Sequence, residues 1–216
     1  REGRLRGQRI LITAGPTYEK LDPVRFIGNY SSGKMGIALA KECLSQGAEV
    51  ELVLGPCSQP LPHSTLLHVT HVESASDMYH AATRLFADCT AGIMCAAVAD
   101  FTPDTCAKEK IKREGDQMLL RLTPTQDIAA AVGYMKTSTQ KLCGFALETH
   151  NALVHAQEKL QRKNLDMIVM NSLQDAGAGF QVDTNKVTII TPDNQESLPL
   201  QSKNDIAREI INRFLS

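Results

Sequence analysis

The residues best suited to binding chemistry lie in the segment between Gly15 and Gly36. It joins the first predicted strand to the first predicted helix through about 20 residues, where a dinucleotide-binding fold usually needs only a handful. Residues 28–34 read GxxxxGK, but Met35 stands where a P-loop places the Ser or Thr that holds Mg²⁺. No strand leads directly into the motif, so we exclude a true P-loop.

Backbone amides in the same segment can still hold an anion. Ser31, Ser32, Gly33 and the helix amides from Lys34 onward offer N–H groups and the positive end of a helix dipole to a phosphate. The alternative is that Gly33 and Gly36 only permit close packing of the helix on the sheet. The sequence favours phosphate binding and leaves the packing interpretation open.

Three further segments carry polar or charged groups near predicted strand ends. In residues 95–100 (CAAVAD) two alanines would let a flat ligand approach the backbone, and Asp100 offers a carboxylate. Taken alone, however, this segment is better explained as ordinary core with a helix or turn cap. Residues 108–113 (KEKIKR) form either a solvated loop or a mobile lid that closes on a polyphosphate. Lys159 and Lys163, four residues apart, share one face of a predicted helix and would suit a triphosphate; a solvated helix face is the alternative.

These segments need a fold that brings strand ends together. Apolar runs predict strands at residues 9–14, 49–54, 65–72, 92–99, 116–122, 141–147, 166–170 and 186–191. Helical periodicity predicts helices at residues 33–47, 76–87 (with Ser76 as N-cap), 127–136, 151–163 and 202–214. The alternation predicts one doubly wound α/β domain. Its sheet is mostly parallel and Rossmann-like, with a small antiparallel add-on around residues 186–191.

Composition narrows the class of protein. A chain of 216 residues fits one α/β domain, and its net charge of −1 lacks the basic excess of a nucleic-acid-coating protein. No apolar run approaches the roughly 20 residues of a membrane helix. The six cysteines form no CxxC pair, which favours free thiols in a reducing, cytoplasmic setting. Because the chain begins at Arg1, we expect a piece of a longer protein, with residues 1–8 as a linker or tail and 9–216 as the domain.

The stretch DPVRFIGNYSSGKMG at residues 22–36 resembles the signature of the phosphopantothenoylcysteine synthetase family. The similarity continues in order through ITAGPT, GAEVELVLGP, AAVAD, EKIKR, PTQDI, GFALET, KNLDMIVMN and F-x-x-D-x-N at residues 180–185. The resemblance implies the bacterial, C-terminal half of a bifunctional flavoprotein of coenzyme A biosynthesis. Such an enzyme uses CTP and Mg²⁺ to convert 4′-phosphopantothenate into an acyl-cytidylate, and the amine of cysteine then displaces CMP.

The resemblance also implies roles for individual residues. Asn29 would contact the acyl group, Arg25 would reach the substrate from the neighbouring subunit of a homodimer, and Lys110 would be the lid lysine that neutralises the reacting phosphate. The nucleotide would contact Ser31, Gly33, Gly36, Asp100, Lys110, Phe145, Lys159 and Lys163, and the substrate would contact Arg25, Asn29, Ala96 and Ala97. It identifies no metal ligands.

The sequence departs from the family pattern at two places, and two other functions stay open. Leu147 stands where the family often has Ala, and residues 123–128 (TPTQDI) replace Asn-Pro-Asp-Ile. The full-length protein is expected to carry a flavin-dependent decarboxylase, with no flavin, nucleic acid or membrane bound by this piece. The alternatives are an NAD(P)-dependent reductase, which the missing GxGxxG disfavours, and a non-catalytic nucleotide-binding module.

Overall fold

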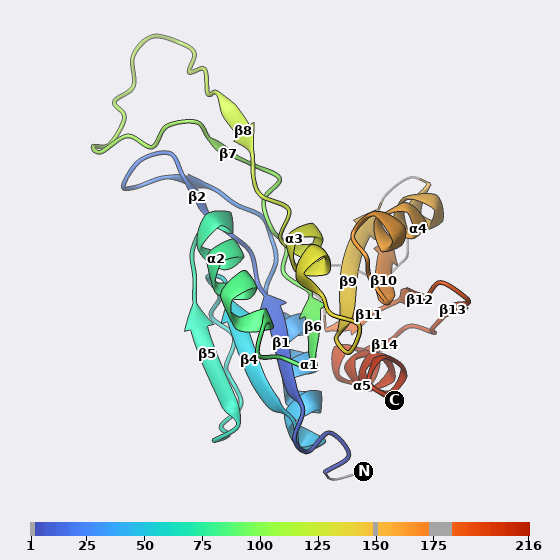
Figure 1. Cartoon of the computed structure of the whole chain (residues 1–216). Coiled ribbons are helices and arrows are strands. Elements are labelled where there is room, and N and C mark those ends of the chain that lie inside the picture. The colour runs from blue at the N-terminus through green and yellow to red at the C-terminus, as the bar shows by residue number, and fades with distance from the viewer. Residues whose placement is uncertain (1–2, 149–150, 173–182) are drawn as a thin grey trace.

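A mixed eight-stranded sheet forms the centre of the computed structural model, which describes residues 3–148, 151–172 and 183–216. The strand order is β13-β12-β10-β9-β6-β1-β4-β5 (Figure 1). The parallel strands are β1 (Arg9–Ala14), β4 (Glu49–Leu54), β5 (Leu67–His71), β6 (Ala91–Met94), β9 (Lys141–Glu148) and β10 (Met167–Ser172). The antiparallel strands are β12 (Val187–Ile190) and β13 (Gln195–Ser197). The doubly wound fold and its antiparallel add-on are therefore confirmed.

The chain changes direction at β1. From β1 it proceeds to β4 and β5 on one side, and it then returns to β6, β9 and β10 on the other. In a doubly wound sheet, a reversal of this kind places a ligand crevice beyond the carboxyl ends of the strands on either side of it, here β1 and β6. Thr13 and Met94 are register partners at that point, so the crevice begins directly beyond them.

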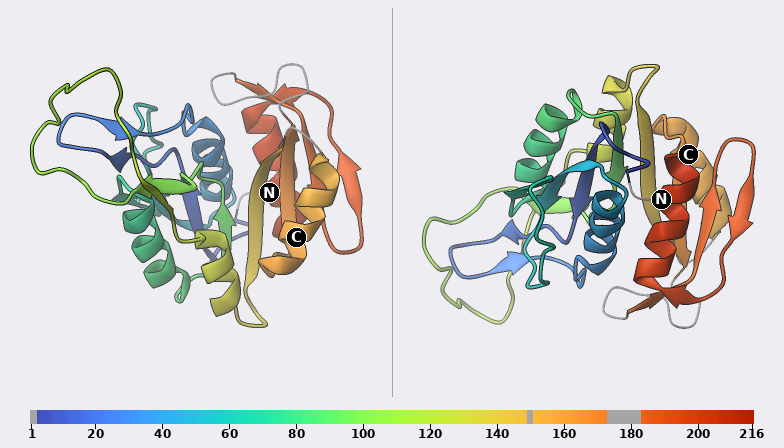
Figure 2. Two further views of the ribbon diagram at one scale, coloured as in Figure 1. Left: turned by 90° about the horizontal axis from the view of Figure 1, so that it is seen from above. Right: turned by 90° about the horizontal axis from the view of Figure 1, so that it is seen from below.

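Helices cover both faces of the sheet because successive strand residues point to opposite faces. On one face, Ile10, Ile12 and Ala14 pack with α1 (Lys34–Ser45) and α5 (Lys203–Phe214). On the other face, Leu11 packs with the cluster formed by α2 (Ala75–Phe86), α3 (Ile128–Met135) and α4 (Ala152–Arg162). Figure 2 shows α1 and α5 on one side of the sheet and α2, α3 and α4 on the other. No helix in the described residues is long and apolar enough to cross a membrane.

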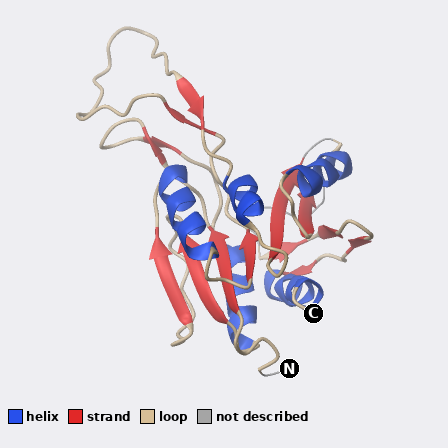
Figure 3. Ribbon diagram, viewed as in Figure 1, coloured by secondary structure: helices blue, strands red, loops and turns tan. Residues whose placement is uncertain are grey.

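Two thin ribbons form an arm that projects from the body (Figures 1 and 3). Strand β2 (Glu19–Lys20) pairs with β3 (Phe26–Ile27), and β7 (Phe101–Pro103) pairs with β8 (Leu122–Pro124). A long loop, residues 104–121, connects β7 to β8 and forms the far end of the arm. The prediction of a strand at residues 116–122 is wrong, because β8 begins at Leu122. Its apolar run, Met118 to Leu120, lies in the exposed loop with no strand to pair with.

Several predicted boundaries shift for identifiable reasons. The N-cap of α2 is Ser74 rather than Ser76, since its side chain accepts a hydrogen bond from the Asp77 amide. Strand β6 ends at Met94, and the residues that follow form the crevice wall instead of continuing the strand. The short strands β11 (Thr184–Asn185) and β14 (Gln201–Ser202) were not predicted. Part of the loop expected after β10, including Phe180, lies outside the described residues.

Residues 3–8 pack on the rest of the chain. The Leu5 side chain is fully buried, and the Leu5 amide donates to the Gln46 carbonyl at 2.8 Å. The Arg4 guanidinium donates to the Leu215 carbonyl at 2.6 Å, so the segment ties the end of α1 to the end of α5. The Arg- and Gly-rich composition concealed this contact because it rests on one apolar side chain.

Candidate functional site

A cleft of about 580 Å³ lies at the carboxyl ends of β1, β6 and β9, where the doubly wound topology predicts a ligand. It runs over the sheet from the start of α3 and one face of α4 to the starts of α1 and α5. Most of the predicted site residues line this cleft: Asn29, Ser31, Gly33, Gly36, Ala96, Ala97, Asp100, Phe145, Lys159 and Lys163. Arg25 and Lys110 are not among its lining residues.

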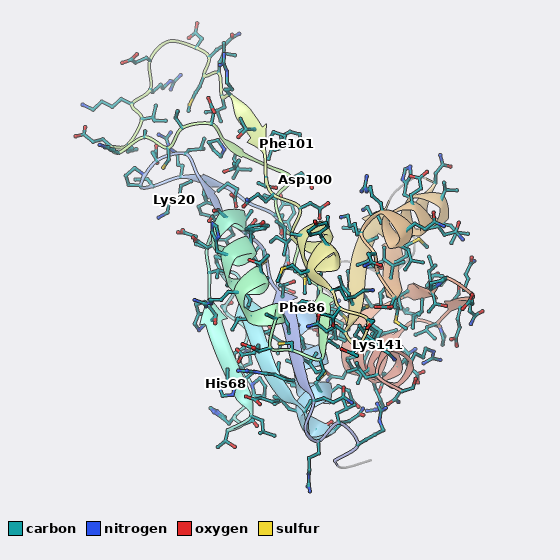
Figure 4. The ribbon with its side chains drawn as sticks, in the orientation of Figure 1. Lys20, His68, Phe86, Asp100, Phe101 and Lys141 are labelled. Carbon is teal, nitrogen blue, oxygen red and sulfur yellow. The ribbon has the colours of Figure 1, made fainter. Side chains whose placement is uncertain are left out.

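Hydrogen bonds between two loops build the centre of the cleft. Asn29 Nδ2 donates to the Ala97 carbonyl at 2.7 Å, and Asn29 Oδ1 accepts from the Ser31 amide at 3.0 Å. The Ala99 amide donates to Thr17 Oγ1 at 2.9 Å, and Thr125 Oγ1 donates to the Ala99 carbonyl. These bonds hold the long loop after β1 against residues 95–100. Asp100 lies where the second of these segments enters the arm (Figure 4).

The two glycines at the start of α1 serve different purposes. Gly33 has φ +80, a left-handed conformation that L side chains rarely adopt, and it turns the chain into the helix. A Cβ on Gly36 would lie 2.3 Å from Ala14 Cβ, so only glycine lets α1 approach β1 this closely. The packing interpretation therefore holds for Gly36. The same close approach presents the first amides of α1 to the cleft.

One end of the cleft is cationic. Lys159 and Lys163 both line it from α4, as the helical spacing predicts. Lys163 Nζ pairs with Asp127 Oδ2 at 3.2 Å, while Asp127 Oδ1 caps α3 by accepting from the Ala130 amide at 3.0 Å. The N-terminus of α3 therefore points into the cleft beside two lysines, which makes this end suited to a polyphosphate.

The opposite end holds residues that sequence reasoning missed. Lys203, the first residue of α5, is only 6% exposed, and its Nζ donates to Asn185 Oδ1 at 3.3 Å. Burial and the neighbouring Lys34 ammonium lower the pKa of Lys203. Lys34 Nζ pairs with Asp183 at 2.8 Å. Asn171 Oδ1 is buried in the lining without a hydrogen-bond partner among the described residues. Lys203 stands at a helix N-terminus, where its positive charge opposes the helix dipole. That unfavourable placement was the feature of the sequence that could have marked Lys203 as a functional residue.

Arg25 and Lys110 both belong to the arm. Arg25 Nη2 donates to Asp22 Oδ2 at 2.5 Å and to the Ile111 carbonyl at 2.6 Å. Lys110 is exposed in the loop between β7 and β8. Arg25 and Lys110, both of which were predicted to act at the site, therefore do not line the cleft of their own chain.

Potential metal ligands gather elsewhere among the described residues. Glu49, Glu51 and His68 place ligand atoms within 4.8 Å of one another on β4 and β5. Arg9 already pairs with Glu51, and His68 Nε2 lies 2.8 Å from Glu49 Oε1, so this group reads as an ion-pair network. In the cleft, Asp100 offers a carboxylate, whereas both oxygens of Asp127 already have partners in Lys163 and the Ala130 amide.

Comparison with known proteins agrees with this architecture. Residues 5–216 match the family described as DNA/pantothenate metabolism flavoprotein C-terminal domain. The chain is 51% identical over its whole length to a cysteine/cysteine sulfinic acid decarboxylase from an unknown prokaryotic organism, of which it covers 60%. It is 45% identical, over 96% of its length, to the coenzyme A biosynthesis bifunctional protein CoaBC of Bacillus subtilis, of which it covers 51%.

The fold also matches a solved structure. The crystal structure of the C-terminal domain of the coenzyme A biosynthesis bifunctional protein CoaBC superposes with a TM-score of 0.83 at 41% identity, covering 98% of this chain and 96% of that one. The chain thus spans about half to three fifths of its curated relatives but nearly all of that domain. It belongs to the family of DNA/pantothenate metabolism flavoprotein C-terminal domains.

Proposed function

We propose that the chain is a phosphopantothenate–cysteine ligase domain that joins 4′-phosphopantothenate to L-cysteine at the expense of CTP. The observation that carries the proposal is a single cleft with anion-binding groups at both ends. The amides of α1 with Lys34 and Lys203 lie at one end, and the start of α3 with Lys159 and Lys163 lies at the other. A reaction between a nucleoside triphosphate and a phosphorylated acid needs two such regions. The names of the CoaBC relatives support the same reaction.

The first half-reaction activates the acid. A carboxylate oxygen of phosphopantothenate attacks the α-phosphorus of CTP, a new O–P bond forms, and the bond from the α-phosphorus to the bridging oxygen breaks as pyrophosphate leaves. Lys159, Lys163 and the α3 amides would hold the triphosphate, and Lys110 would neutralise the leaving charge once the arm brings it to a cleft. Asp100 is the carboxylate of the lining that would help to hold Mg²⁺, and the ion would supply further charge neutralisation.

The second half-reaction forms the amide. The cysteine amine attacks the acyl carbon, the C–N bond forms, the amine loses a proton and CMP leaves with the acyl oxygen. Asn29, whose side chain already spans the cleft loops, would orient the acyl group. No protein nucleophile is required. Burial raises the pKa of Cys95, the thiol in the cleft lining, to about 12, so it stays protonated and does not compete with the amine.

We further propose that two copies of the chain combine through the arm. Its ribbons expose large apolar side chains, with Val24 61%, Phe26 47% and Phe101 51% exposed. Arg25 lies on the same arm and outside its own cleft, so a paired arm would carry it to the neighbouring site. Light scattering should give twice the 23.6 kDa chain mass, and Phe26→Asp combined with Phe101→Asp should reduce it to the single-chain mass.

Pyrophosphate release tests the activity. With phosphopantothenate and Mg²⁺, the protein should release pyrophosphate from CTP faster than from ATP and form the amide when cysteine is added. Release of none would leave a non-catalytic nucleotide-binding module. Thermal shift tests the reductase alternative, because CTP with Mg²⁺ should raise the Tm and NADPH should not.

Two variants test the assigned roles. Asn29→Asp should still release pyrophosphate but form little amide, and an equal loss of both steps would contradict its role with the intermediate. Lys110→Gln should slow pyrophosphate release, and an unchanged rate would contradict its role. Lys41→Gln, an exposed lysine on α1 outside the cleft lining, serves as the matched control and should match the unmodified protein in both assays.

The curated relatives also contain a region that this chain does not match, and that region needs a function of its own. We propose that the full-length protein fuses this domain to a flavin-dependent decarboxylase, and that the decarboxylase name of one relative refers to the part outside the matched region. This domain alone should therefore release no CO₂ from cysteine or phosphopantothenoylcysteine. We place the reaction in the cytoplasm, in keeping with the six free thiols.

A further inference from the structure

Asp22 is a fully buried carboxylate within an exposed arm. Its side chain is 0% exposed, whereas the Arg25 side chain beside it is 41% exposed. Oδ1 accepts hydrogen bonds from the Val24 and Arg25 amides, both at 2.8 Å, and thereby shapes a local turn. Oδ2 faces the opposite way and accepts from the Ile111 amide at 3.0 Å and from the Arg25 guanidinium. The two oxygens therefore have separate tasks.

Ile111 is held at both of its backbone polar groups. Its amide donates to Asp22 Oδ2, and its carbonyl accepts from Arg25 Nη2 at 2.6 Å. A further bond, from the Ala107 amide to the Leu21 carbonyl at 2.9 Å, joins the same two segments. Most other residues of the loop 104–121 are exposed. The loop is thus anchored at the residue next to Lys110 and open beyond it.

The anchor is charge-assisted. The Arg25 guanidinium and the three backbone amides hold the pKa of Asp22 well below its usual range, so the carboxylate is ionised throughout neutral pH. Hydrogen bonds to an ionised acceptor are stronger than bonds between neutral groups, which suits a tether on an otherwise exposed loop.

We propose that Asp22 is a positioning residue that holds Arg25 and the Lys110 loop together as one unit. Asp22 itself touches neither substrate nor nucleotide. It acts through Ile111, so that Lys110 and Arg25 approach the reacting phosphate together. The catalytic part of this proposal rests on the proposed ligase function, whereas the tether itself does not.

Asp22→Asn separates the two tasks of the carboxylate. The amide oxygen can keep the turn bonds of Oδ1, while the NH₂ group replaces Oδ2 and faces the Ile111 amide and the guanidinium as a donor. Trypsin cleavage of the Lys110–Ile111 bond, followed by mass spectrometry, should become roughly tenfold faster, because the loss of a charge-assisted bond favours the opened loop. Lys20→Gln, which breaks the exposed pair between Lys20 on the same hairpin and Glu73 before α2, is the matched control and should leave cleavage unchanged.

A double-mutant cycle tests the catalytic part. Asp22→Asn should slow pyrophosphate release while the KM for CTP stays within about twofold. Combined with Lys110→Gln, it should be no slower than Lys110→Gln alone to within about twofold, because both changes remove one interacting unit. Ile111→Pro removes the same bond from the loop side, leaves the turn intact, and should slow release likewise if Asp22→Asn folds poorly.

The cleavage assay tests the tether, and the pyrophosphate assay tests the catalytic role. Unchanged cleavage at Lys110–Ile111 overturns the tether, and multiplicative losses in the double variant overturn the action through Lys110. If the unmodified protein releases no pyrophosphate from any nucleotide, the ligase function fails and the catalytic role of Asp22 falls with it. The cleavage rate then still shows whether Asp22 holds the loop.

Discussion

Replacing Gly36 with alanine should destabilise the domain by a calculable clash. The new Cβ would lie 2.3 Å from Ala14 Cβ and 3.1 Å from Ala14 Cα. Contacting carbons sit about 3.5–4.0 Å apart, so α1 would have to move away from β1 by about an ångström. Overpacking of this kind costs about 1–3 kcal/mol, and the better helix propensity of alanine returns up to about 1 kcal/mol. We expect a net loss of about 1–2 kcal/mol.

Thermal unfolding measures this loss. For a domain of this size a Tm falls by about 2–4 °C per kcal/mol, so Gly36→Ala should lower the Tm by about 2–8 °C. Ala14→Gly removes the opposing methyl group and should recover about 1 kcal/mol of that loss in the double variant. Gly33→Ala is the matched control. It also destabilises, by about 1–2 kcal/mol from its left-handed backbone, but its loss should be independent of residue 14.

The energetic coupling between Gly36→Ala and Ala14→Gly shows whether Gly36 is needed for helix packing or for contact with a phosphate. If the losses of Gly36→Ala and Ala14→Gly simply add, the clash is not the cause and the packing argument fails. If Gly36→Ala leaves the Tm within about 1 °C but abolishes the CTP-induced shift, the glycine serves only the ligand. We expect a lower Tm, and a CTP response that recovers together with stability in the double variant.

Two further predictions concern a helix cap and the thiols. Asp127→Ala should lower the free energy of unfolding by about 1 kcal/mol, because it removes the cap of α3. It should also weaken CTP binding, because Lys163 loses the carboxylate that holds it. The control Asp88→Ala should do neither, and an Asp127→Ala variant with the Tm of the parent would contradict the cap. Among the six cysteines, exposed Cys106 should react first with a thiol reagent at pH 8, because burial raises the pKa of Cys89 and Cys95 to about 12. Since those thiols ionise near 9 when unfolded, stability should fall as pH rises from about 9 to 12, and a flat stability over that range would contradict their burial.

The sequence predicted the centre of the fold because that part follows simple burial. Strands such as β1 and β6 are covered on both faces and are mostly apolar in sequence, and α1 and α4 show one apolar face each. The arm escaped prediction because its strands have two or three residues and face solvent. An apolar run such as Met118–Leu120 then indicates a buried strand that the arm does not contain.

The sequence predicted the site residues that lie in loops directly after strands. It missed those that reach the cleft only through the packing of elements distant in sequence. Asn29, Ala97 and Asp100 lie in loops that the topology places at one sheet edge, so their proximity followed from the order of strands. Lys203 enters the cleft from the start of α5, and Asn171 from the end of β10. Neither has a neighbouring glycine or charge pattern that marks a binding loop, and only the packing of α5 against α1 brings Lys203 to Lys34.

Two predicted site residues that lie outside the cleft indicate how the site could be completed. Arg25 and Lys110 are the two that the cleft lacks, and they are joined to each other through Asp22 and Ile111. Because both are held to Asp22, they would move together as the unit proposed above. Its apolar faces, at Phe26 and Phe101, are exposed on the same ribbons. Docking those faces on a second copy would therefore bury them and deliver both cations in a single step.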